Sequence, residues 1–273
     1  MLKLMYITNN PEIARIAEDA GVERIFVDME YIGKSDRQGG MDTVQSQHTL
    51  EDIANVRKEL KKSELLVRCN PIHGYVEGYG TSEEEINSII SSGADIIMLP
   101  YFKTVSEVQQ FVKIVNGRVK TMLLFETPES VDHVDEILAI DGINEVFIGL
   151  NDLSLGYGKK FMFELLTDGT VENLCRKFSE KGLPYGFGGI ASVGQGLLPA
   201  EYVIAEHYRL GSTCVILSRS FCDVSKIGSL EEAKELFAIG LSGIRRYESF
   251  YVQQGQSFFN DNTRTIKEII AQI

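Results

Sequence analysis

The sequence lacks long apolar runs, paired cysteines and an excess of positive charge. No window reaches the roughly 18 uninterrupted apolar residues of a transmembrane helix. With 27 basic and 39 acidic residues the net charge is -12, so nucleic acid and anionic membranes should be repelled. We therefore expect a cytoplasmic protein that binds neither. The cysteines have no zinc-like spacing and predict buried thiols in a reducing compartment: Cys69, Cys175, Cys214 and Cys222.

Short apolar runs of strand character alternate with helical patterns along the whole chain. Parallel neighbours need a crossover helix, so strict alternation predicts a parallel sheet. A doubly wound sheet would need a Gly-rich turn after the first strand, where this chain has Thr8-Asn9-Asn10. We therefore predict an α/β fold, a (β/α)8 TIM barrel with a C-terminal helical extension. The predicted strands are residues 2–7, 24–29, 65–69, 95–99, 121–125, 145–149, 184–188 and 213–218.

The predicted domain organisation is a catalytic barrel over residues 1–248 and an extension over residues 249–273. The length of 273 residues, with 44% hydrophobic side chains, is enough for one barrel-type domain. The extension is predicted to begin as a polar linker that contains aromatic residues, Ser249 to Asn262, followed by an amphipathic segment, Thr265 to Ile273. We expect this tail to pack on its own barrel or on a neighbouring subunit of a homo-oligomer.

Two of the predicted strands lead into a carboxylate, Glu126 after residues 121–125 and Asp152 after residues 145–149. Strand ends gather at one face of a barrel, and lone charges are costly there, so the pair favours a cation site. Two carboxylates completed by water and substrate oxygens suit Mg²⁺ or Mn²⁺, whereas zinc would require His or Cys ligands. Alternatively, the two residues are solvated strand ends or helix N-caps.

Arg68 ends an apolar strand at the same predicted face. Its planar guanidinium is suited to a carboxylate or a developing oxyanion. The alternative is a structural ion pair with Asp28 or Glu30 of the neighbouring strand, and the two roles are compatible. No lysine occupies a predicted strand end, which argues against a Schiff-base mechanism, because that route needs a desolvated amine in the site.

The connections after the strands offer further candidates. The loop from Glu30 to His48 is long and polar, which is typical of a lid or a substrate contact, although a solvated excursion is the alternative. His48 and His73 both follow strand ends and could transfer protons. The glycine-rich run 186–196 would admit a ligand such as phosphate close to the backbone, or it serves close strand packing.

With these residues in view, the chain resembles the HpcH/HpaI aldolase and citrate lyase β-subunit family of the phosphoenolpyruvate/pyruvate barrel superfamily. The similarity runs from about Phe26 to Gly158, with weaker agreement up to the predicted strand 8. It rests on four blocks at predicted strand ends. They are Phe-Val-Asp-Met-Glu at 26–30, Leu-Val-Arg-Cys-Asn-Pro at 66–71, Gly-Ala-Asp-Ile-Ile-Met-Leu-Pro at 93–100, and Phe-Glu-Thr at 125–127 with Phe-Ile-Gly-Leu-Asn-Asp-Leu-Ser at 147–154.

The resemblance implies that Glu126 and Asp152 hold Mg²⁺ or Mn²⁺, which chelates a pyruvate-like unit. Arg68 would stabilise the enolate oxygen, and Asp28 and Glu30 would organise water around the ion. The implied activity is cleavage or formation of a carbon–carbon bond next to the enolate of a small 4-hydroxy-2-oxo acid. We expect further substrate contacts from residues that follow the same strands: Asn70, Leu150, Asn151 and Gly189.

One departure leaves the proton-transfer group open. Aldolases of this family commonly carry a histidine directly after the acidic pair, and this chain has Tyr31. Tyr31, His48 and His73 are the candidates, and His48 is the first choice because it closes the long loop just before a helix start. The citrate lyase branch also lacks that histidine, so an acyl-thioester lyase is the second hypothesis. A non-catalytic barrel that binds a metal and an oxo acid is the third.

Overall fold

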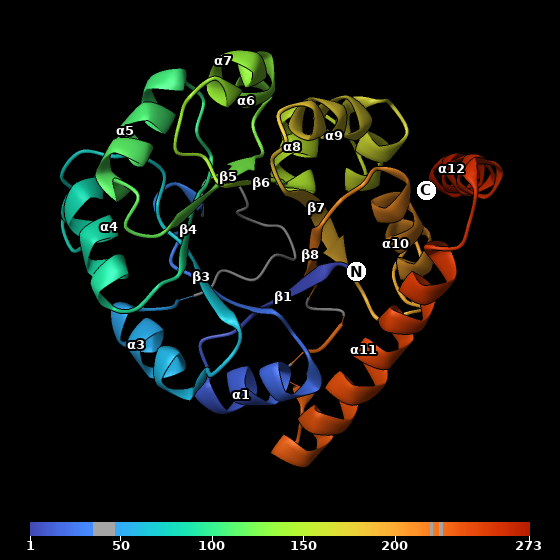
Figure 1. Ribbon diagram of the computed structural model, residues 1–273, viewed down its shortest axis with the longest axis horizontal. Helices are drawn as coiled ribbons and strands as arrows, with labels where there is room; N and C mark the ends of the chain where they lie inside the picture. The colour runs from blue at the N-terminus through green and yellow to red at the C-terminus, as the bar shows by residue number, and fades with distance from the viewer. Residues whose placement is uncertain (35–46, 219–220, 224–225) are drawn as a thin grey trace.

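In the computed structural model, eight strands of the described chain form a closed parallel barrel in sequence order (Figure 1). The structure describes residues 1–34, 47–218, 221–223 and 226–273. The TIM barrel prediction is confirmed, and every strand lies within two residues of its predicted bounds. The strands are β1 Lys3–Ile7, β2 Arg24–Asp28, β3 Glu64–Arg68, β4 Ile96–Leu99, β5 Lys120–Phe125, β6 Glu145–Ile148, β7 Tyr185–Ile190 and β8 Cys214–Leu217.

Helices surround the barrel (Figure 1). Their starts follow local sequence signals: the side chain of Asn10 accepts hydrogen bonds from the amides of Glu12 and Ile13, and Thr49 and Thr81 each form a capping box. The helices are α1 Pro11–Ala20, α3 Leu50–Glu59, α4 Ser82–Ser91, α5 Val105–Val115, α6 Pro128–Asp132, α7 Val134–Leu138, α8 Leu150–Gly156, the 3₁₀ helix η1 Met162–Leu166, α9 Thr170–Glu180, α10 Ala200–Arg209, α11 Leu230–Tyr251 and α12 Gln256–Ile270.

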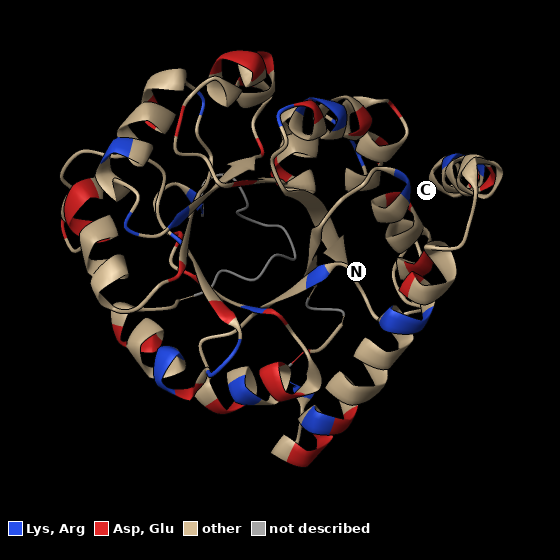
Figure 2. Cartoon of the chain, in the orientation of Figure 1, with Lys and Arg blue, Asp and Glu red and all other residues tan. Residues whose placement is uncertain are grey.

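The core has two layers because successive strand residues point to opposite faces. In β2, Phe26 points into the barrel, whereas its neighbours Ile25 and Val27 pack against the outer helices. The barrel interior is closed by large side chains, including Met98 and Phe147. Charged residues are spread over the outer helices (Figure 2). Among the described helices, none combines the length and apolar character that crossing a membrane requires.

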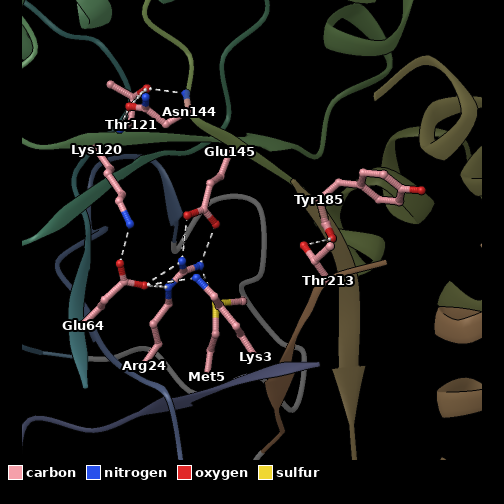
Figure 3. A network of polar contacts seen from close by, with 10 residues as sticks. All are labelled: Lys3, Met5, Arg24, Glu64, Lys120, Thr121, Asn144, Glu145, Tyr185 and Thr213. Atoms are coloured by element: carbon pink, nitrogen blue, oxygen red, sulfur yellow. Dashed lines mark hydrogen bonds and ion pairs between the residues drawn. The ribbon is translucent and has the colours of Figure 1, made fainter. Parts of the chain in front are cut away.

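A buried ionic network closes the amino-terminal end of the barrel (Figure 3). Arg24 at the start of β2 is fully buried and donates to both carboxylate oxygens of Glu145, at 2.8 and 2.7 Å. Its Nε donates to Glu64 at 2.9 Å. Lys120 donates to the other oxygen of Glu64 at 2.5 Å. Sequence analysis did not identify this network, which lies at the end of the barrel opposite the predicted site.

The predicted linker at the C-terminus is wrong. Helix α11 continues to Tyr251, and α12 already begins at Gln256, before the predicted Thr265. The aromatic residues of this segment are packing residues of the helix: Phe259 is buried, and the ring of Phe258 lies 5.7 Å from that of Tyr251. The extension therefore packs on its own barrel, beside α10 (Figure 1).

The contact between α12 and α10 is partly polar. The buried carboxylate of Glu206 accepts hydrogen bonds from Asn262 Nδ2 at 2.9 Å and Thr263 Oγ1 at 3.0 Å. Its other oxygen accepts from Arg209 Nε at 2.8 Å. Because a buried carboxylate is costly without partners, these bonds fix the position of α12 on the barrel.

Candidate active site

Glu126 and Asp152 lie together at the carboxyl ends of the strands. Glu126 directly follows β5, and Asp152 lies in the first turn of α8, which starts after Gly149. The two carboxylate residues are 3% and 7% exposed. A Cβ at Gly149 would stand 2.8 Å from Oε2 of Glu126, so the glycine leaves room for that carboxylate. The prediction that these strand ends converge is confirmed.

Two small pockets share this carboxylate pair. One, of about 190 Å³, is lined by Arg68, Glu126 and Asp152 together with residues of β6, β7 and β8. The other, of about 240 Å³, lies between Tyr101 and α8. A larger hollow of about 650 Å³ lies at the amino-terminal end of the strands, away from the pair, and several of its basic side chains already have acidic partners. Barrel chemistry belongs to the carboxyl ends, so we place the site at the two smaller pockets.

The electrostatics of Glu126 favour a cation. Burial, and then the charges of Glu30 and Asp152, raise its pKa well above the usual range. Arg68 opposes this, as does the backbone N–H of Tyr101, which donates to Glu126 Oε1 at 2.9 Å. Tyr101 has a left-handed backbone with φ of 47°, a costly conformation for a tyrosine. The backbone is thus strained at a residue whose amide orients the carboxylate.

Arg68 is held by the two acidic residues of the β2 end. Its Nε and Nη2 donate to the two oxygens of Asp28 at 2.8 and 2.7 Å, and its Nη1 lies 3.2 Å from Glu30 Oε2. Burial alone would raise the pKa of Asp28, but Arg68 and Lys34 hold it below the usual range. The structural ion pair is therefore present, and Arg68 also lines the 190 Å³ pocket. Both roles weighed for this residue are compatible with its position.

Lys34 is a site residue that sequence analysis missed. Its side chain is 5% exposed, and its Nζ lies 2.7 Å from Asp28 Oδ2 and 3.6 Å from Glu30 Oε2. The inference that the site has no desolvated lysine is thus wrong, because Lys34 reaches the site from beyond the strand end. Of the described residues that line the two pockets, however, none is a lysine. The lack of a lysine amine facing the pocket still disfavours a Schiff base.

The three proton-transfer candidates differ in their surroundings. His48 is buried, and its Nδ1 accepts the backbone N–H of Asp28 at 3.0 Å. Burial lowers its pKa, so the ring is neutral near neutral pH with its proton on Nε2. The hydroxyl of Tyr31 donates to the backbone carbonyl of His48, and burial raises its pKa to about 12. His73 Nε2 lies 3.0 Å from Glu85.

Of the predicted substrate contacts, Leu150, Asn151 and Gly189 line the 190 Å³ pocket. Asn70 instead holds the chain that follows β2. Its Oδ1 accepts hydrogen bonds from the backbone N–H groups of Tyr31 and Ile32, both at 2.8 Å. Its substrate contact stays a prediction. The greater part of the predicted lid or substrate loop, residues 35–46, lies outside the described residues.

The glycines of β7 serve different purposes. A Cβ at Gly186 would stand 2.1 Å from the carbonyl oxygen of Cys214, and one at Gly188 would stand 2.7 Å from Leu150. Close packing therefore explains these two positions. A Cβ at Gly189 would make only ordinary contacts, at 3.5 Å, so packing does not require that glycine. Gly188 and Gly189 both line the 190 Å³ pocket.

The residues present fit a hard divalent cation. Across the described ranges, no three or more His, Cys, Asp or Glu side chains gather as a metal site. The candidate donors are Glu126 and Asp152, which line the same two pockets. Two carboxylates, with water and substrate supplying the other oxygens, are a common donor set for Mg²⁺. A cation there would also offset the repulsion that raises the pKa of Glu126.

Comparison with known proteins identifies the family of the chain. The model of the HpcH/HpaI aldolase/citrate lyase family matches residues 3–163, a range that contains Arg68, Glu126 and Asp152. The chain belongs to the HpcH/HpaI aldolase/citrate lyase family. A hydroxypyruvate/pyruvate aldolase from Roseovarius nubinhibens is 32% identical over 72 residues, which are 26% of this chain and 27% of that relative. The match thus spans about a quarter of the relative's length.

Solved structures of the HpcH/HpaI family share the fold. An HpcH/HpaI aldolase from Desulfitobacterium hafniense has a TM-score of 0.61 at 17% identity and covers 89% of this chain and 93% of its own. An HpcH/HpaI aldolase/citrate lyase family protein from Burkholderia cenocepacia has a TM-score of 0.62 at 15% identity, with 85% and 94% covered. At these identities the likeness supports the barrel and no particular substrate.

Proposed function

We propose that this protein is a divalent-metal-dependent carbon–carbon lyase of the aldolase type that acts on a 2-oxo acid through a pyruvate-type enolate. The observation that supports this most is the burial of Glu126 and Asp152 on the same small pocket as Arg68. The pocket volume of about 190 Å³ is below the roughly 300–1,000 Å³ of sites for drug-sized ligands, and suits a small acid.

The acidic side chains of the site support a dication. Among the described residues, four buried carboxylates lie with two cationic side chains, so acidic groups outnumber basic ones in this part of the site. They are Asp28, Glu30, Glu126 and Asp152 against Arg68 and Lys34. Glu126 and Asp152 would hold Mg²⁺ or Mn²⁺. When bound, such an ion acts as a Lewis acid that polarises the carbonyl group of the oxo acid.

Among the described residues that line the pocket, Arg68 carries the positive charge. Two of its N–H groups are committed to Asp28, which fixes the plane of the guanidinium before the substrate arrives. Its Nη1 also lies 3.2 Å from Glu30 Oε2, so the substrate carboxylate or the enolate oxygen would bind the N–H groups that these two acidic residues leave. A donor that is oriented in advance stabilises developing charge without reorganising during the reaction.

His48 is our proposed proton-transfer residue. Its Nδ1 lone pair is used by the Asp28 amide, so the neutral ring can donate a hydrogen bond from Nε2 but offers no free acceptor. A neutral imidazole is too weak an acid to give up this proton, so His48 would act by hydrogen-bonding the water molecule that carries the proton to the enolate carbon. Tyr31 is less suited, because its hydroxyl proton is already used in the hydrogen bond to the His48 carbonyl.

The proposed substrate is a 4-hydroxy-2-oxo acid. When a water molecule takes the proton of the C4 hydroxyl, the C3–C4 bond can break, which releases an aldehyde and leaves a three-carbon enolate; the same proton can then be returned to C3. The name of the Roseovarius relative, a hydroxypyruvate/pyruvate aldolase, supports the same substrate class.

Enolisation is the step that tests this proposal. Pyruvate is incubated in D₂O with the metal-free protein, with and without added Mg²⁺ or Mn²⁺, and the loss of methyl protons is followed by NMR. We expect exchange only with metal, and none in the Glu126→Gln protein. Metal binding without exchange, and without cleavage of any 4-hydroxy-2-oxo acid, would instead support a binding-only barrel. Cleavage of an acyl thioester in place of free oxo acids would support the citrate-lyase-like reaction.

A further inference from the structure

Asn70 joins the chain after β2 to helix α4. Its Oδ1 accepts the backbone N–H groups of Tyr31 and Ile32, both at 2.8 Å. Its Nδ2 donates to Glu85 Oε1 at 3.0 Å, and its own backbone N–H donates to the same oxygen at 3.0 Å. Asn70 is 1% exposed and Glu85 is 6% exposed, so these hydrogen bonds are shielded from water.

Glu85 fixes the direction in which the Asn70 amide points. The backbone N–H of Asn70 points at Glu85 Oε1, so this oxygen is an acceptor, and the NH₂ group of the Asn70 side chain must face it. The side-chain oxygen then faces the amides of Tyr31 and Ile32. The reversed amide would place oxygen against oxygen on one side and N–H against N–H on the other, which is costly for buried groups.

His73 holds the second oxygen of the Glu85 carboxylate. The ring Nε2 lies 3.0 Å from Glu85 Oε2, and the ring Nδ1 lies 2.6 Å from the carbonyl oxygen of Gly74. A carbonyl oxygen can only accept, so Nδ1 carries a hydrogen there, and Nε2 is engaged by the carboxylate. The backbone N–H of His73 donates to Ser82 Oγ at 2.8 Å, which ties the same loop to the start of α4. The loop before α4 thus supports Glu85.

The segment that Asn70 holds carries Glu30, which contacts Arg68. Glu30 directly precedes Tyr31, and its own backbone N–H donates to Asp28 Oδ1 at 3.2 Å. The backbone of Glu30 is therefore held by Asp28 on one side and by Asn70 on the other. Its Oε2 lies 3.2 Å from Arg68 Nη1, so the position of this backbone affects the guanidinium that lines the pocket.

We propose that Glu85 is a positioning residue that acts through Asn70. It orients the Asn70 amide, which fixes the backbone after β2 and thereby the contact between Glu30 and Arg68. The expected effect on turnover rests on the proposed function. The effect on the backbone concerns hydrogen bonds within this chain alone, and it holds whether or not the protein is a lyase.

Three variants separate this role from a purely structural one. Glu85→Leu removes the acceptor and leaves Asn70 in place, so the amide can reverse. Glu85→Gln is the conservative variant, because its carbonyl oxygen can accept both bonds from Asn70 and its NH₂ group can donate to His73 Nε2. Glu18→Leu is the matched control. The Glu18 carboxylate is also buried and accepts the backbone N–H groups of residues 61–63, but these directly precede β3, at the opposite end of the barrel.

The first experiment needs no metal and measures hydrogen exchange of the Tyr31 and Ile32 backbone N–H groups by NMR. Their rates are compared with those of the β5 amides, which report a loss of stability in the whole barrel. Relative to β5, we expect about tenfold faster exchange in Glu85→Leu, and rates within about threefold of wild type in Glu85→Gln and Glu18→Leu. No increase in Glu85→Leu, or an increase that the β5 amides share equally, would overturn the proposal.

The second experiment follows exchange of the pyruvate methyl protons in D₂O with Mn²⁺, below the melting temperature of every variant. Glu85→Leu should lower kcat by about tenfold or more, because the oriented donor is less well fixed. Mn²⁺ affinity should stay near wild type, since Glu126 and Asp152 are unchanged. Glu85→Gln should restore the rate, and Glu18→Leu should not lower it. A wild-type kcat in Glu85→Leu, or an equal loss in Glu18→Leu, would refute the effect on turnover.

The two experiments keep the proposed function and the positioning role apart. If wild-type protein shows no pyruvate exchange with Mn²⁺, the proposed function fails. The first experiment then still decides whether Glu85 holds the backbone after β2 through Asn70.

Discussion

Arg68 and Asp28 lie directly opposite each other on neighbouring parallel strands, and the arginine donates two parallel hydrogen bonds to the carboxylate. Such a pair is geometrically specific, because the planar fork of donors matches the two oxygens of a carboxylate. The closed barrel provides the register that makes the pairing possible. Asp28 therefore connects the strand framework to Arg68, which lines the pocket.

The role of Arg68 predicts the effect of Arg68→Lys. Lysine keeps the charge but cannot form the paired bonds to Asp28, so its ammonium is not oriented toward the substrate. We expect a loss of about 3 kcal/mol of transition-state stabilisation, a hundredfold or more in kcat, as for other oriented donors. Steady-state kinetics together with Mn²⁺ titration tests this, since metal affinity should stay near wild type. A lower melting temperature with normal kcat would leave only the structural ion pair.

The raised pKa of Glu126 predicts that the stability of the protein depends on pH and on bound metal. Its folded-state pKa is raised, so in the metal-free protein its stabilising contribution is full below the ordinary value of 4.5 and is lost as pH rises toward the folded-state value. Glu126→Gln should remove this loss and be at least as stable as metal-free wild type at neutral pH. Thermal unfolding across pH 4 to 8 measures both effects.

Added metal should act in the opposite direction. Binding to the folded state raises its stability, so Mg²⁺ or Mn²⁺ should raise the melting temperature of wild-type protein. The same addition should have little effect on Glu126→Gln and Asp152→Asn. An equal rise in all three proteins would place the metal elsewhere.

The lowered pKa of His48 predicts a second dependence of stability on pH. Burial lowers its pKa below the ordinary value of 6.5, so its stabilising contribution is full above that value and is lost as pH falls toward the folded-state value. The slope from one such group is at most about 1.4 kcal/mol per pH unit. His207, whose pKa burial lowers to about 3, adds a loss of the same sign in both proteins compared below.

The comparison with His48→Asn isolates His48. The asparagine carbonyl can still accept the Asp28 amide but does not titrate, so this variant should lose less stability between pH 7 and 5 than wild type. Urea unfolding at a series of pH values measures the difference. His48→Ala should in addition lower turnover with little change in metal affinity. Full activity of His48→Ala would show that His48 takes no part in proton transfer.

The strands and the carboxylate site could be predicted because each depends on local information. Every strand is a short apolar run between helical patterns, and the rule that barrel strands end at one face brings Glu126, Asp152 and Arg68 together without any knowledge of loops. Lys34 could not be placed in this way, since its position depends on the path of the chain after β2. The sequence does show that Lys34 lies four residues after Glu30, a spacing at which the two charges can meet. Tyr101, whose amide binds Glu126, could likewise have been considered for the site, because it closely follows the end of β4.

The extension shows a different limit. Its aromatic residues resemble those of a linker in the sequence, because the helices that they pack against, α10 and α11, cannot be identified from the local pattern. The buried Arg24 network is a third case, because Glu145 lies 121 residues away in the sequence and on the opposite side of the barrel interior. Only closure of the sheet brings the two side chains together. Contacts of this kind depend on tertiary geometry that local patterns do not contain.

Breaking the ion pair between Arg24 and Glu145 should lower the stability of the protein without lowering its activity. Glu145→Gln leaves the buried guanidinium with a neutral partner in place of a carboxylate that accepts two of its hydrogen bonds. Breaking one partner of a buried ion pair typically costs about 3–5 kcal/mol, and the remaining bond to Glu64 places this case near the lower end. The network lies at the end of the barrel opposite Glu126, so Mn²⁺ affinity and pyruvate exchange should be unchanged below the melting temperature.

Urea unfolding measures the free energy of unfolding of the Glu145→Gln protein, and Lys3→Met is the control. Lys3 is 49% exposed and lies 3.7 Å from Glu64 at the edge of the same network. That substitution should cost at most about 1 kcal/mol. Equal losses in the two variants would show that burial of Arg24 does not depend on Glu145.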